Sequence, residues 1–134
     1  MVKELAPLLL IFFVVLLLYH PVLGVFFAQD DFFHFKASLT DGSLKQFIGL
    51  FGFYPIEQRG YGFYRPIFRE VLYNLYYRVF SLNHLPFRVF SFALHFINIS
   101  LVFVLLQKLF KKIKLSFFAA FFFGITAANI APLY

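Results

Sequence analysis

The chain has 134 residues, of which 62% are hydrophobic and 13% are charged, and phenylalanine occurs 24 times. A typical soluble domain has roughly 25% charged residues, and a fold of this length cannot hide so much apolar surface from water. The composition therefore argues against a soluble enzyme, a nucleic-acid-binding module and a disordered tail, although 12 Lys and Arg against 6 Asp and Glu give a net charge of +6. Because there is no Cys, a disulfide framework, a thiolate zinc site and a cysteine nucleophile are excluded.

Three apolar stretches predict an all-α, polytopic membrane protein. The first, residues 5–27, has no charge between Glu4 and Asp30 and is longer than the roughly 20 residues that cross a hydrocarbon core. A cleaved signal peptide has a shorter apolar core of about 7–15 residues, so we expect an uncleaved membrane helix. The other two stretches cover 87–107 and 115–132. We therefore predict about three transmembrane helices in a single membrane domain that spans residues 1–134.

The link between the second and third apolar stretches is strongly basic, and its lysines are Lys108, Lys111, Lys112 and Lys114. Short basic loops usually stay in the cytoplasm. This favours a location of residues 28–86 on the extracytoplasmic side of the cell membrane. The long segment is itself rich in Lys and Arg, so charge alone leaves the orientation open.

The segment 28–86 is predicted to be partly helical, with amphipathic helices at about 43–51 and 66–82. Pro66 suits the first turn of the second helix. The apolar face of this helix consists of Phe68, Leu72, Leu75 and Val79, and its polar stripe of Glu70, Asn74 and Arg78. Such a helix can lie on a membrane surface, in a groove of a larger protein or flat on the helix bundle.

Asp30 and Asp31 directly follow the first apolar stretch. They can simply end the hydrophobic run, or they can supply a general base or a ligand for a divalent metal such as Mg or Mn. Because adjacent residues on a helix point about 100° apart, we expect one of the two to face a given pocket. His20 and His34 flank the pair and are weak additional candidates for metal ligation.

Two further pairs of residues are candidate contacts. Arg65 lies near the expected N-cap of the second helix, with Arg69 one turn later, so the two could bind a phosphate group or contact lipid headgroups. His95 and Asn98 lie at i and i+3 inside the second apolar stretch. We expect them on one side of that helix, in interhelical hydrogen bonds or in contact with a substrate.

The order of these features resembles a known family. The sequence runs from an apolar helix through Gln29-Asp30-Asp31-Phe32-Phe33-His34, a long outer segment, Tyr64-Arg65-Pro66-Ile67 and Phe87-Arg88-Val89 to a last helix that ends in Ile130-Ala131-Pro132-Leu133-Tyr134. It is similar to the N-terminal part of the polytopic GT-C glycosyltransferases, the protein-mannosyltransferase-like and arabinosyltransferase-like bacterial membrane enzymes. The similarity extends over essentially the whole chain.

The resemblance implies a sugar transfer from a polyprenyl-phosphate donor to a lipid, glycan or protein acceptor. Asp30 or Asp31 would be the catalytic carboxylate or a metal ligand, and Arg65 and Arg69 would bind the donor phosphate. Asn129 and Ala131 depart from the family, whose members often have a His and an acidic residue near this point.

GT-C enzymes also have many more membrane helices than this chain. We therefore expect a fragment that is inactive alone, with the bilayer, the lipid-linked sugar and the missing C-terminal helices as partners, and no nucleic acid. The alternatives are a small non-catalytic membrane anchor or assembly subunit, and a fragment of a transporter.

Overall fold

The computed structural model describes residues 2–53 and 65–126. All regular elements in this part of the chain are helical and no strand occurs there, as expected for an all-α protein. The chain divides into two compact units. The first, Met1–Val25 with His84–Tyr134, is called the apolar unit here, and the second, Phe26–Asn83, is called the intervening unit. Each is described by itself.

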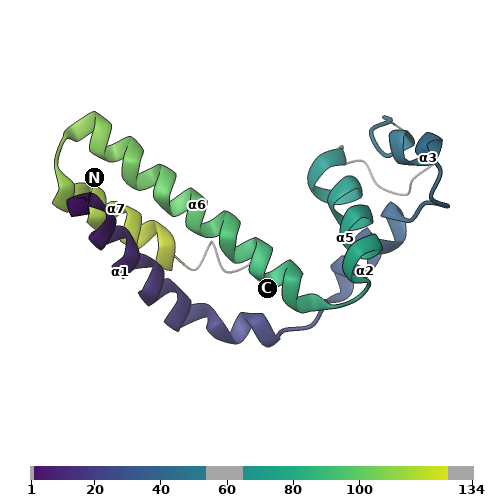
Figure 1. Cartoon of the computed structure of the whole chain (residues 1–134), viewed down its shortest axis with the longest axis horizontal. Helices are drawn as coiled ribbons and strands as arrows, with labels where there is room; N and C mark the ends of the chain where they lie inside the picture. The colour runs from purple at the N-terminus through teal and green to yellow at the C-terminus, as the bar shows by residue number, and fades with distance from the viewer. Residues whose placement is uncertain (1, 54–64, 127–134) are drawn as a thin grey trace. The chain divides into compact units, whose positions relative to one another are not determined.

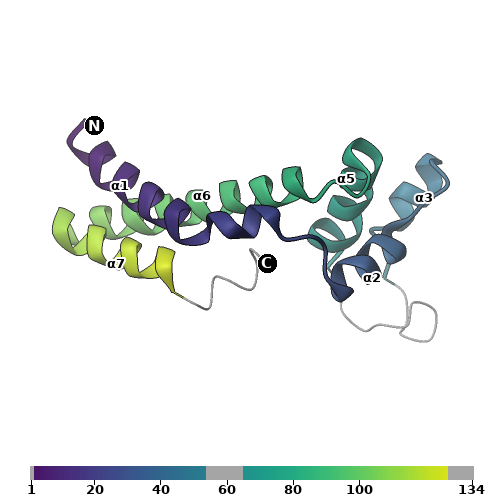
Figure 2. The ribbon, with the colours of Figure 1, turned by 90° about the horizontal axis from the view of Figure 1, so that it is seen from below.

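The apolar unit contains α1 (Val2–Tyr19), a short 3₁₀ helix η1 (His20–Gly24), α6 (His84–Phe110) and α7 (Ile113–Ile125). Helices α1 and α7 run in the same direction and α6 runs against them (Figures 1 and 2). The hydroxyl of Tyr19 donates a hydrogen bond of 2.8 Å to the backbone oxygen of Ile125, which joins the ends of α1 and α7. This alternation of direction is the one that consecutive membrane spans would have.

Two segments of the apolar unit, Ala6–Gly24 and His84–Phe110, are long and apolar enough to cross a membrane. They correspond to the first two predicted spans. Helix α7 has 13 residues and is therefore only about 20 Å long, shorter than a hydrocarbon core of about 30 Å. It matches the predicted third span, 115–132, as far as residue 125, and residues 127–132 lie outside the described part of the chain.

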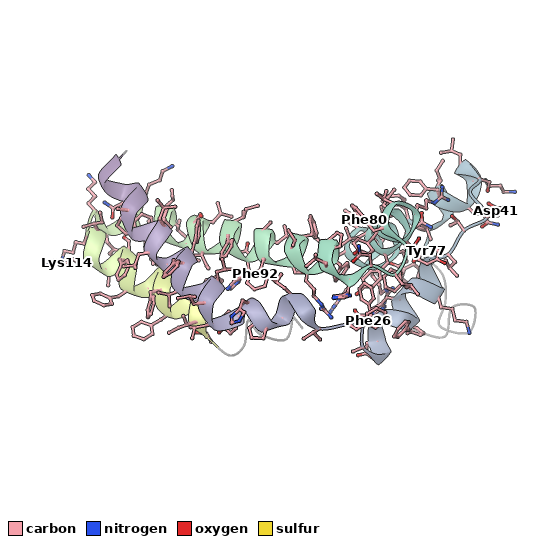
Figure 3. The ribbon with its side chains drawn as sticks, turned by 60° about the horizontal axis from the view of Figure 1, so that its bottom comes forward. Phe26, Asp41, Tyr77, Phe80, Phe92 and Lys114 are labelled. Carbon is pink, nitrogen blue, oxygen red and sulfur yellow. The ribbon has the colours of Figure 1, made fainter. Side chains whose placement is uncertain are left out.

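The core of the apolar unit is a narrow stripe where three helices meet. It consists of Ile11, Val15, Tyr19, Val22, Phe92, Ile99, Phe103 and Ala120, and Figure 3 shows Phe92 on α6. Gly124 allows the close approach, because a Cβ at this position would lie 3.0 Å from Ile99 Cδ1 and 3.1 Å from Val15 Cγ2. The outward faces stay apolar and exposed, for example at Leu101. Small residues at contacts and apolar residues outside are typical of membrane helices.

The intervening unit begins with two helices, α2 (Gln29–Ser38) and α3 (Leu44–Gly49). Helix α2 was not expected from the sequence. The helix predicted at about 43–51 is present and shorter, and Ser43 caps it, since its hydroxyl accepts a hydrogen bond of 3.3 Å from the backbone N–H of Gln46.

The helix predicted at 66–82 consists of two parts, a π-helical segment η2 (Pro66–Val71) and the α-helix α5 (Leu72–Phe80). Two members of the predicted polar stripe, Glu70 and Asn74, are turned into the unit, whereas the third, Arg78, is exposed. Glu70 and Asn74 are 1% and 3% exposed, whereas Phe68 and Val79 are each 69% exposed.

Candidate functional site

The acid pair opens α2, and its two carboxylates differ in their surroundings. Asp31 Oδ2 accepts a hydrogen bond of 3.0 Å from the backbone N–H of Ala28, and Asp31 Oδ1 accepts one of 2.7 Å from the hydroxyl of Tyr73 on α5. Asp30 is exposed and makes no hydrogen bond with the residues that the structure describes. Asp31 therefore joins α2 to α5, while the carboxylate of Asp30 is exposed.

His34 lies one turn further along α2. It belongs to one cluster with Asp30, Asp31, Arg69 and Tyr73. Its ring lies 5.4 Å from that of Tyr73, and its Nδ1 is buried with no hydrogen-bond partner among the described residues. Loss of hydration and, to a smaller extent, the positive charge of Arg69 lower the pKa of His34. The carboxylates of Asp31 and Asp30 act on it in the opposite direction. The structure thus brings the acid pair and Arg69 into one electrostatic neighbourhood.

Arg69 and Glu70 form an ion pair inside the intervening unit. The Nε of Arg69 donates a hydrogen bond of 3.0 Å to Glu70 Oε1, and a second guanidinium nitrogen bonds the same oxygen. Both side chains are buried, so the guanidinium of Arg69 is engaged by a partner of its own unit. Arg65 is exposed and directly precedes Pro66, and its preceding neighbour Tyr64 lies outside the described residues.

His95 and Asn98 belong to the apolar unit and are not part of this cluster. His95 is buried, and its Nε2 donates a hydrogen bond of 3.0 Å to the backbone oxygen of Gly124, since a carbonyl can only accept. This is a bond between α6 and α7. Asn98 is exposed, so the two residues do not share the interior.

Two contacts, one in each unit, were not anticipated from the sequence. Tyr73 holds Asp31 from a position 42 residues away, and no local pattern indicates such a pair. Arg88 is 2% exposed, and its Nε donates a hydrogen bond of 3.1 Å to the backbone oxygen of Val25. A lone arginine in an otherwise apolar helix is a signal that could have identified this contact.

The described residues contain no ready-made cluster of ligands for a divalent metal. Within the described ranges, no three His, Cys, Asp or Glu side chains gather as possible ligands. Mg and Ca need several oxygen ligands, and both oxygens of Asp31 already accept hydrogen bonds. His20, the other flanking histidine, belongs to the apolar unit, where its Nδ1 bonds the backbone oxygen of Leu17 at 2.9 Å. The metal ligation proposed for Asp30 and Asp31 stays a prediction.

Comparison with known proteins identifies no relative. No protein-family model matches the chain, and neither a curated protein nor a solved structure matches it.

Proposed function

We propose that this chain is the N-terminal part of a membrane glycosyltransferase of the GT-C type, which transfers a sugar from a polyprenyl-phosphate donor on the extracytoplasmic side of the cell membrane. The observation that carries the proposal is the difference in surroundings between the two acids of the pair. Asp30 is an open carboxylate at the start of α2, and its neighbour Asp31 is fixed by Ala28 and Tyr73. The two segments long and apolar enough to cross a membrane support a membrane location.

The reaction is a single displacement at the anomeric carbon. Asp30 takes the proton of the acceptor hydroxyl while the oxygen of that hydroxyl attacks the anomeric carbon. The bond between this carbon and the phosphate oxygen breaks, and the polyprenyl phosphate leaves with the electron pair. Asp31 does not receive the proton in this scheme. Its two hydrogen bonds hold the first turn of α2 and thereby position Asp30.

The leaving phosphate gains negative charge, which a cation must stabilise. Arg65 is exposed before the first turn of η2 and takes this role in the proposal, because a guanidinium binds phosphate with two hydrogen bonds. Arg69, the other candidate, is buried with Glu70 inside the unit and acts by holding η2 in place.

A lipid-linked donor also fits the place of the acids in the chain. Asp30 follows Gly24, the end of the first candidate span, by six residues, and six residues reach at most roughly 20 Å. The carboxylate is therefore tethered near the level at which lipid headgroups lie, where the phosphate of a polyprenyl donor would be presented.

The test is a transfer assay on the protein in its native membranes, with a labelled polyprenyl-phosphate sugar. Asp30→Asn should lower transfer about 100-fold or more, the usual effect of removing a general base, while expression and thermal melting stay unchanged. Asp41→Asn is the matched control, since Asp41 is an exposed acid of the same unit and lies outside the cluster. Addition of EDTA should leave transfer unchanged.

Other results would favour the alternative functions. Loss of assembly with no transfer in the wild type would favour a non-catalytic anchor or assembly subunit. Altered flux of a solute without any sugar transfer would favour a transporter fragment. Full transfer by Asp30→Asn would end the proposal that Asp30 is the base.

A further inference from the structure

The segment formed by η2 and α5 is amphipathic in an unusual sense, because its hydrophilic side is buried. Asn74 donates hydrogen bonds from Nδ2 to the backbone oxygen of Ser38 at 2.7 Å and to the hydroxyl of Thr40 at 3.1 Å. Together with the pair of Arg69 and Glu70, these bonds hold the polar side against the rest of the unit. The helix cannot turn its apolar side inward without breaking them.

The opposite side of the segment is apolar and exposed. Ile67 and Phe68 are 60% and 69% exposed, and Leu75 and Val79 are 47% and 69% exposed. Phe68, Leu75 and Val79 follow a helical spacing that places them on one face. These four residues are called the outward face here. A soluble monomer rarely leaves such a face uncovered, so it contacts another apolar phase.

The short segments that connect the intervening unit to the two candidate spans indicate what the outward face contacts. Helix α5 ends at Phe80, and the apolar helix α6 begins at His84. Four residues reach at most about 14 Å. At the other end, α2 begins at Gln29, five residues after the first candidate span ends at Gly24. If both spans cross the bilayer, the intervening unit is held by short tethers next to a headgroup layer that is roughly 5–8 Å thick.

We propose that the outward face lies in the bilayer interface, as a lipid-contacting surface of the intervening unit. This inference rests on the membrane location in the proposed function and does not depend on glycosyl transfer. Arg78, whose guanidinium donates a hydrogen bond of 2.6 Å to the hydroxyl of Thr40, is exposed and directly precedes Val79 in the chain. Figure 3 shows the neighbouring residues Tyr77 and Phe80 at this end of α5.

The experiment uses spin labels on single cysteines, which are unambiguous because the chain has no native Cys. The full chain is reconstituted in vesicles of phosphatidylcholine and phosphatidylglycerol, with labels at Phe68→Cys and Val79→Cys. Leu101→Cys on α6 is the reference for lipid, since Leu101 is 61% exposed in a candidate span, and Lys36→Cys on α2 is the reference for water. All four positions are exposed, so the label does not disturb packing.

Collision rates with oxygen, which partitions into lipid, and with a nickel chelate, which stays in water, then locate each label. We expect the ratio of oxygen to nickel collisions at Phe68→Cys and Val79→Cys to approach that of Leu101→Cys and to exceed that of Lys36→Cys. A ratio equal to that of Lys36→Cys would place the face in water and overturn the inference.

Immobilised labels with few collisions of either kind would mean that protein covers the face, which also overturns it. Dipolar broadening between labelled copies would then identify a second copy as the cover. If Leu101→Cys itself shows no contact with lipid, the membrane location in the proposed function fails, and this result is distinct from a failure at Phe68 and Val79 alone.

Discussion

Both units of the molecule bury apolar side chains, but they differ in how their helices turn polar and apolar side chains. The apolar unit has a hydrophobic core with Gly124 at its tightest contact, and its exposed surface is apolar as well. The intervening unit buries Glu70, Asn74 and Arg69 next to aromatic rings and exposes apolar residues of α5. A hydrophobic stripe in the sequence therefore identifies a face of a helix, but it does not indicate whether that face contacts protein or lipid.

The source of stability should differ accordingly. Between apolar helices in lipid, close packing provides the favourable free energy of association, because the lipid is as apolar as the side chains. In the intervening unit, the buried polar groups are favourable only while their partners are present.

Removal of the Glu70 carboxylate should have the largest effect. Glu70→Ala leaves the buried guanidinium of Arg69 without its partner, which typically costs about 3–5 kcal/mol. The double variant Arg69→Met with Glu70→Leu should recover most of this loss, since an apolar pair of similar volume needs no charge partner. Thermal melting in detergent measures both. If the double variant is as unstable as Glu70→Ala, the interior of this unit does not depend on a paired charge.

A side chain at Gly124 should have the next largest effect, and it tests the apolar unit. Gly124→Val puts carbon atoms into a space where Cβ alone meets Ile99 at 3.0 Å and Val15 at 3.1 Å. Overpacking of this kind costs about 1–3 kcal/mol. Gly24→Ala is the control, because nothing lies within 4 Å of a Cβ at that position, and it should leave the melting temperature nearly unchanged. Equal melting of the two variants would contradict tight packing at α7.

The same contrast explains which features the sequence could predict. The charge-free runs identified α1 and α6 because a candidate span is recognised from its length and apolar composition alone. Pro66 indicated where the helix after it begins, since N-terminal prolines act locally. These signals need no knowledge of what packs against the helix.

Contacts between distant residues could not be predicted in this way. Helix α2 has no clear apolar periodicity, and Asp31 is joined to Tyr73 across 42 residues. The sequence placed Asp30, Asp31 and Arg69 in one segment, and only the packing of η2 and α5 against α2 brings them into one cluster. Which side of α5 turns inward depends equally on partners such as Ser38, which no local pattern reveals.

The buried histidine of the apolar unit should have a smaller effect than the buried ion pair. His95→Leu removes the hydrogen bond to the backbone oxygen of Gly124 while the volume stays similar. Hydrogen bonds between membrane helices are worth about 0.6 kcal/mol on average and at most about 1.7 kcal/mol. Asn98→Leu, an exposed change on the same helix, is the control. A loss for His95→Leu as large as that for Glu70→Ala would show that both units depend on buried polar groups.

The smallest expected effect is a pH dependence that comes from His34. The pKa of His34 is lowered from its ordinary value of 6.5, first by loss of hydration and then by Arg69. As pH falls below about 6.5, the unfolded chain therefore takes up a proton that the folded chain does not, so stability decreases with falling pH until the lowered pKa is reached. His34→Gln should weaken this decrease in melting temperatures measured between about pH 7.5 and pH 5. The decrease is modest because His34 is partly exposed and solvent screens its charge.

His20→Gln, in the apolar unit, controls for the loss of an imidazole as such. An equal change in both variants would mean that the cluster around Asp31 does not shift the proton equilibrium of His34.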